Sequence, residues 1–124
     1  MEISVLLTCY DRAAREVIAV RVAGLGCTVA LPTPDAALDL IASNKVDVVM
    51  VGPSAHGRER QQLIATLEQH PRIPVVVDVT ARDADLGADF VHRLGCNRVE
   101  LLMPPLSGLN EVLGRLRKAQ GLGP

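Results

Sequence analysis

The segment that decides the fold is residues 45–53, KVDVVMVGP, in which a continuous apolar run ends at Gly52 and Pro53. The run does not alternate between apolar and polar residues, so the strand it predicts must be covered on both faces. Strands covered on both faces are typical of parallel sheets that lie between layers of helices. The Gly-Pro pair that follows predicts a turn where the strand ends.

Short apolar, β-branched runs occur five times, three of them continuous, and each is followed by a segment with helical spacing. Five alternations of strand and helix predict a doubly wound α/β sandwich, the (βα)5 flavodoxin-like architecture with a five-stranded parallel sheet. The predicted strands are Ile3–Thr8, Cys27–Leu31, Val46–Val51, Pro74–Val79 and Arg98–Met103. The predicted helices are Arg12–Gly24, Pro34–Ser43, Arg58–His70, Ala84–Leu94 and Ser107–Ala119. We expect one domain over residues 1–119, with 120–124 (QGLGP) as a tail or the start of a linker.

Local signals support these helices. Short polar residues at their starts predict side-chain caps, and Pro34 fits a first helical position. The expected caps are Asp11, Thr33, Asp83 and Ser107, with Ser54 before the third helix. The apolar positions that we expect to face the core include Ala14, Val17 and Ile18 of the first helix and Ala88, Val91 and Leu94 of the fourth.

Composition restricts the function. The 124 residues have a net charge of −1 and contain one Tyr, one Phe and no Trp. Nucleic-acid binding therefore lacks both a basic surface and aromatic stacking platforms. No apolar run reaches the ~18 residues of a membrane span, and Glu2 does not suit the basic start of a signal peptide. Three widely spaced cysteines favour reduced thiols, so we expect a cytoplasmic protein that binds neither nucleic acid nor membrane.

Five segments together resemble the receiver domain of the bacterial response-regulator family, and the resemblance covers nearly the whole chain. They are ISVLLTCYD (3–11), GCTVALPTPDAALDLI (26–41), KVDVVMVGP (45–53), IPVVVDVTARD (73–83) and LGCNRVELLMPP (94–105). The resemblance implies a site for phosphoryl transfer to an aspartate at the ends of the strands. Such a site needs a carboxylate nucleophile, further carboxylates that hold Mg²⁺, and a cation.

The residues at those positions depart from the family's pattern. Gly52 falls on the phosphoacceptor, Cys9 and Tyr10 fall on the acidic pair, and the lysine position falls on Leu102 or Met103. Asp11, just beyond the pair, is a carboxylate, and Thr80 matches the switch hydroxyl. The resemblance thus implies a pseudo-receiver with no catalytic residue, metal or cofactor and a degenerate pocket of Cys9, Tyr10, Asp11, Gly52, Thr80 and Met103. The alternative is that the third strand is misaligned with the family's pattern, and that Gly52 and Pro53 form an ordinary turn.

The resemblance also implies how such a domain acts. In this family the surface of the fourth helix, fifth strand and fifth helix commonly carries dimerisation or partner contacts, and here it spans about residues 84–118. We therefore expect a phosphorylation-independent interaction module that contacts itself or a protein partner. Its polar and apolar interface candidates are Arg93, Glu100, Leu106, Leu109, Glu111 and Arg115.

Other functions remain open from the sequence. The strand ends could bind a nucleotide or another small anion through Arg58, Arg60 and Arg82. A third option is an enzyme that uses the Cys9 thiol, although we expect a packed thiol there, and Cys27 and Cys96 as small core residues. Asp78 lies either at a sheet edge or toward the pocket. The spacing of His56, His70 and His92 matches no metal motif, and we expect all three to be solvated.

Overall fold

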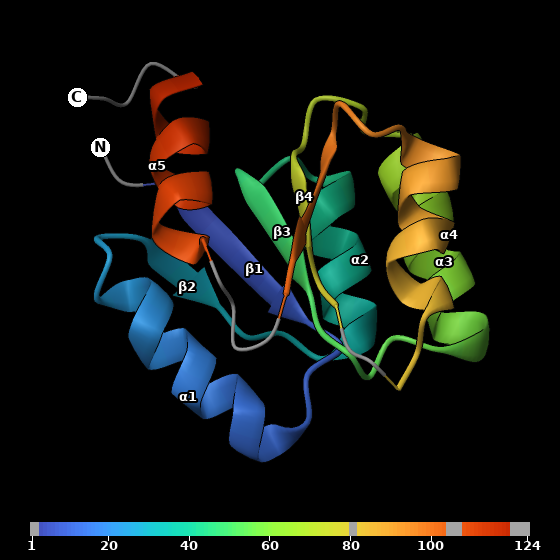
Figure 1. The fold of residues 1–124 in the computed structure, drawn as a ribbon, viewed down its shortest axis with the longest axis horizontal. Coiled ribbons are helices and arrows are strands. Elements are labelled where there is room, and N and C mark those ends of the chain that lie inside the picture. The colour runs from blue at the N-terminus through green and yellow to red at the C-terminus, as the bar shows by residue number, and fades with distance from the viewer. Residues whose placement is uncertain (1–2, 80–81, 104–107, 120–124) are drawn as a thin grey trace.

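The computed structural model describes residues 3–79, 82–103 and 108–119 (Figure 1). Strands and helices alternate as expected, and their ends lie within a few residues of the predicted ones. The strands are β1 (Ser4–Thr8), β2 (Thr28–Ala30), β3 (Val48–Val51), β4 (Val75–Asp78) and β5 (Val99–Leu102). The helices are α1 (Arg12–Ala23), α2 (Pro34–Ala42), α3 (Gly57–Glu68), α4 (Asp85–Leu94) and α5 (Leu109–Ala119).

All five strands are parallel and form one sheet in the order β2-β1-β3-β4-β5. Strand β3 pairs with β1 on one side and β4 on the other, and its four residues are buried. The chain runs outward from β1 to β2 and then returns to β3 on the other side of β1. The strand order therefore reverses between β1 and β3, which is where open α/β sheets form their sites.

Helices cover both faces of the sheet (Figure 1). Successive residues of β3 serve opposite faces, because Val49 and Val51 pack in the cluster on the α2–α3–α4 side, whereas Val48 and Met50 pack in the cluster on the α1–α5 side. The core is aliphatic apart from Phe90 and Tyr10. In the described part of the chain, no helix combines the length and apolar character needed to cross a lipid bilayer.

Two helix starts follow the sequence signals, and one does not. Asp11 Oδ1 accepts the Ala14 N–H at 2.8 Å, and Thr33 Oγ1 accepts the Ala36 N–H at 3.3 Å, which confirms both caps. Ser54 does not cap α3, because that helix begins only at Gly57. Asp83 lies one residue before the N-cap of α4, and its Oδ1 accepts the Asp85 N–H at 3.2 Å. Ser107 and the 120–124 tail lie outside the described residues.

Several positions expected in the core face solvent instead. Helix α1 buries Ile18 and Val22, and Val17 is 70% exposed. Helix α4 turns Leu86, Gly87 and Phe90 inward and leaves Ala88 on the surface. A Cβ atom at Gly87 would lie 3.0 Å from a methyl group of Leu101, so this helix approaches β5 through a residue without a side chain. A hydrophobicity pattern does not detect such a contact. Cys27 is buried as expected, but Cys96 is exposed.

Candidate functional site

The candidate site lies at the carboxyl ends of the strands, beside the reversal of strand order. Cys9 and Tyr10 directly follow β1, and Gly52 directly follows β3. The Gly52 N–H donates to the Thr8 carbonyl and the Ser54 N–H donates to the Cys9 carbonyl, both at 2.8 Å. These two hydrogen bonds hold the turn after β3 against the end of β1.

The ring of Tyr10 fills the space that a side chain at position 52 would need. A Cβ atom on Gly52 would lie 2.5 Å from Cγ and Cδ1 of Tyr10 and 2.6 Å from the Cys9 carbonyl oxygen. Carbon atoms in contact are normally about 3.5–4.0 Å apart. Tyr10 is only 9% exposed, so its ring has little room to move aside. Position 52 is therefore confined to glycine by close packing.

Beyond Gly52, the Tyr10 side chain approaches Asp78 at the end of β4. Burial raises the pKa of the Tyr10 hydroxyl above its ordinary value, and the nearby charge of Asp78 raises it further. Burial also raises the pKa of the half-buried Asp78 carboxyl, and its interaction with Tyr10 partly offsets that rise. The buried hydroxyl oxygen has no hydrogen-bond partner of ordinary geometry within the described residues. Of the two alternatives for Asp78, this position favours the one toward the pocket, since β4 is an inner strand.

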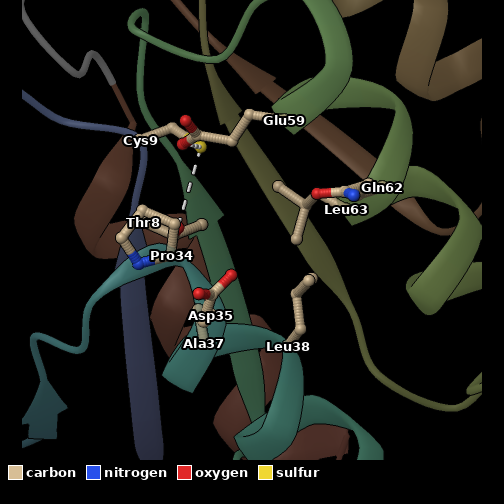
Figure 2. A pocket seen from close by; sticks show the side chains of 9 residues that line it. All are labelled: Thr8, Cys9, Pro34, Asp35, Ala37, Leu38, Glu59, Gln62 and Leu63. Atoms are coloured by element: carbon tan, nitrogen blue, oxygen red, sulfur yellow. Dashed lines mark hydrogen bonds between the residues drawn. The ribbon is translucent and has the colours of Figure 1, made fainter.

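Cys9 lies at the opposite side of this region, above a small hollow between β1, α2 and α3. Figure 2 shows its thiol close to Thr8 and Glu59. Its Sγ donates to Glu59 Oε1 at 3.2 Å and lies 3.6 Å from Thr8 Oγ1. Burial, with a contribution from Glu59, raises the pKa of Cys9 to about 12. The hollow measures about 20 Å³, which is room for about one water molecule. On its other side Cys9 borders a wider, open hollow of about 300 Å³, which Tyr10 and Asp11 also line. Space alone therefore does not exclude a substrate, but a thiol that stays protonated at neutral pH does not suit a nucleophile.

The residues present do not fit a magnesium ion. Asp11 is exposed, and one of its carboxylate oxygens accepts the helix-capping hydrogen bond from Ala14. Within residues 3–79, 82–103 and 108–119, no three His, Cys, Asp or Glu side chains are grouped as metal ligands. At the lysine position, Leu102 is buried in the core and Met103 is 60% exposed. Neither offers a cation. Thr80 lies outside the described residues.

Arg60 corrects the expectation of an anion site. Its side chain is buried, and it forms ion pairs with Asp83 and Asp89. The cation is thus already neutralised by the protein's own carboxylates and faces inward. Arg58 and Arg82 are exposed. The sequence did not predict this network, because the partners lie 23 and 29 residues away from Arg60.

The expected interaction surface also needs two corrections. Leu109 is fully buried, because it is the first core residue of α5. Arg93 turns toward α3, where it donates to Glu68 and Gln61, so its polar atoms are already bonded within the chain. The remaining polar candidates lie on or beside β5: Glu100 pairs with Arg115 at 2.9 Å, and Glu111 is exposed on α5. Leu106 lies outside the described residues.

Sequence reasoning missed the most exposed apolar residues of that surface. Leu101 is 46% exposed and Met103 is 60% exposed, both at the β5 edge of the sheet. Their exposure could have been predicted from the topology, because the last strand of this fold lies at an edge of the sheet and has only one neighbouring strand.

Comparison with solved structures identifies the fold. No protein-family model matches the sequence, and no curated protein sequence matches it significantly. The signal receiver domain of an HD domain-containing protein from Pseudomonas fluorescens Pf-5 superposes with a TM-score of 0.71 at 22% identity, over 98% of this chain and 96% of that one. The receiver domain of the Francisella response regulator 1452 gives a TM-score of 0.73 at 18% identity, over 96% and 99%. NtrX from Brucella abortus gives 0.65 at 18% identity, over 98% of this chain and 26% of NtrX.

The class is therefore a doubly wound, flavodoxin-like α/β protein. Within that class the chain has the fold of response-regulator receiver domains, as the resemblance implied.

The packing of Tyr10 on Gly52 predicts the effect of adding one methyl group. We expect Gly52→Ala to lower the free energy of unfolding by about 2–3 kcal/mol, because neither the ring nor the backbone carbonyl can withdraw freely. Urea denaturation followed by circular dichroism measures this change. The matched control is Gly114→Ala on α5, where nothing lies within 4 Å of the added atom. That variant should be neutral or more stable by up to about 1 kcal/mol. Equal effects of the two substitutions would contradict the packing.

The environment of Cys9 predicts its reactivity. In the folded protein at pH 7, iodoacetamide should modify the exposed Cys96 and leave Cys9 and Cys27 unmodified until denaturant is added. The pKa of Cys9 lies at about 12, so its thiolate fraction, and hence its alkylation rate, should rise with pH throughout the alkaline range. Mass spectrometry of peptides from wild type and Cys96→Ser reports each site. Rapid modification of Cys9 at pH 7 would contradict this description and favour an enzyme that uses the thiol.

Proposed function

We propose that this chain is a pseudo-receiver, a phosphorylation-independent interaction module in bacterial signal transduction that acts in the cytoplasm. The observation that carries the proposal is the position of the Tyr10 ring, 2.5 Å from where a side chain at position 52 would begin. An aspartate cannot occupy that position in this packing. The receiver fold supports a role in signalling, and the altered site supports a role without phosphoryl transfer.

At the positions that the resemblance implies, three parts of the phosphoryl-transfer machinery are replaced by residues with another physical role, and Thr80 still matches the switch hydroxyl. Gly52, at the phosphoacceptor position, allows close packing. Cys9 and Tyr10, at the acidic pair, are a protonated thiol and a buried ring. Met103 or Leu102, at the lysine position, has no charge. A carboxylate nucleophile, a metal site and a cation must all be present for the reaction, so three simultaneous replacements favour loss of the chemistry.

The surface that we propose for binding is centred on β5 and lies between α4 and α5. It presents the exposed apolar side chains of Leu101, which lies against Gly87 of α4, and Met103, just after the strand. On the α5 side of the same strand, the partly exposed Glu100 and Arg115 form an ion pair. Protein interfaces typically combine apolar and polar groups of this kind. We infer that the partner is a second copy of this chain or another signalling protein.

The loss of phosphoryl transfer is tested by treating the protein with acetyl phosphate and Mg²⁺. Intact-mass spectrometry should show no stoichiometric gain of a phosphoryl group, because no carboxylate lies at the acceptor position. An active receiver domain treated in parallel shows that the donor is competent. Stoichiometric phosphorylation of any aspartate of this chain would contradict the proposal.

The binding surface is tested by light scattering after gel filtration over a range of concentrations. The homodimer form of the proposal predicts a concentration-dependent mass that falls to the monomer value in Met103→Asp. Val17→Asp is the matched control, since Val17 is an exposed apolar residue (70%, against 60% for Met103) on α1, which packs on β1 and β2 at the other side of the sheet from β5. A monomer at every concentration would exclude the homodimer, and equal effects of both variants would exclude this face.

A further inference from the structure

Arg60 joins the region around the start of α3 to the region around the start of α4, which lies more than twenty residues further along the chain. This residue belongs to the first turn of α3 and is only 7% exposed. Its Nε and Nη2 donate to the Ala55 carbonyl at 2.9 and 2.8 Å, in the turn between β3 and α3. Its Nη1 donates to Asp89 Oδ2 of α4 at 2.8 Å, and its Nη2 also donates to Asp83 Oδ2, in the connection between β4 and α4.

The electrostatics make this connection strong. Burial alone disfavours the charged guanidinium, but the two carboxylates outweigh that effect and keep the pKa of Arg60 above its ordinary value. Hydrogen bonds to charged partners are about twice as strong as neutral ones. Only the cation of these pairs is buried, since the side chains of Asp83 and Asp89 are 29% and 40% exposed. Loss of a carboxylate would therefore leave the buried Arg60 undercompensated, whereas loss of Arg60 would free both carboxylates to solvent and release their hold on α4.

The start of α4 depends on this connection. The N-cap residue of that helix, Ala84, has no side chain that can cap it. The N–H of Asp85 is instead accepted by Asp83 Oδ1, while the other oxygen of the same carboxylate binds Arg60. Arg60 therefore orients the carboxylate that satisfies the first turn of α4, and it holds the helix directly through Asp89.

We infer that Arg60 is a positioning residue, which ties the turn after Gly52 to the beginning of α4 and holds α4 in one position with no ligand at position 52. This inference rests on the proposed function, because α4 borders the proposed binding surface. The inference explains how the proposed binding surface could keep one shape without phosphorylation, because the buried guanidinium of Arg60 holds α4 beside it.

Hydrogen–deuterium exchange of the full chain, read by mass spectrometry, tests this role. In Arg60→Met, the amides of residues 82–94 should exchange about tenfold faster or more, while those of β1 and β3 keep their protection. The matched control is Arg98→Met. Arg98 donates to the backbone carbonyls of Ile73 at 2.8 Å and His70 at 2.6 Å, near the amino ends of β4 and β5, whereas α4 begins beyond the carboxyl end of β4. Its loss should accelerate exchange near residues 70–75 and leave α4 unchanged.

Asp89→Asn provides a second variant that preserves shape, in case Arg60→Met does not fold. It removes one charged acceptor and should accelerate exchange in α4 alone, by less than the loss of Arg60. Unchanged exchange in α4, or equal acceleration in every strand, would overturn the inference. The exchange measurement requires neither a phosphodonor nor a partner, so its failure is distinguishable from failure of the proposed function. Phosphorylation of the chain would defeat that function and leave the exchange pattern as it is.

Discussion

The contact between the ring of Tyr10 and the backbone of Gly52 is the constraint on which the rest of the site depends. A Cβ atom at position 52 would approach that ring to 2.5 Å. A bulky ring at position 10 therefore requires a glycine at position 52. A buried aromatic ring stabilises a core by removing apolar surface from water. Here it stabilises the junction between the ends of β1 and β3, at the carboxyl edge of the sheet.

Much of the fold could be predicted from the sequence, because its signals are local. The continuous apolar run before Gly52 predicts a strand buried on both faces, and β3 is buried throughout. Asp11 and Thr33 predict helix starts, and both accept the expected backbone hydrogen bonds. The predictions of burial and helix capping failed where a contact with a residue distant in the sequence determines the local structure. Gly87 is buried because Leu101 of β5 lies against it. Ser54 does not cap α3 because the turn that is bonded to the Cys9 carbonyl extends past it, and the helix begins only at Gly57.

The candidate site could be predicted only in part. Resemblance to receivers predicted which residues stand at the strand ends, and the structure brings Cys9, Tyr10 and Gly52 together. It did not predict that Tyr10 covers Gly52, since a sequence gives no direction to a side chain. Nor did it predict that Arg60 turns inward, because the carboxylates that hold it lie on another helix and its preceding loop. In both features a side chain packs or pairs with groups that are distant in the sequence: Tyr10 with Gly52, and Arg60 with Asp83 and Asp89.

A double-mutant cycle on Tyr10 and Gly52 tests the central claim most directly. Denaturant unfolding of wild type, Gly52→Ala, Tyr10→Ala and the double variant gives the interaction free energy of the two positions. If the ring occupies the space beside Gly52, the methyl group should be tolerated better once the ring is removed, with a coupling of about 1–2 kcal/mol. Strictly additive effects would contradict the account, because they would mean that the Tyr10 ring and a side chain at position 52 do not compete for the same space.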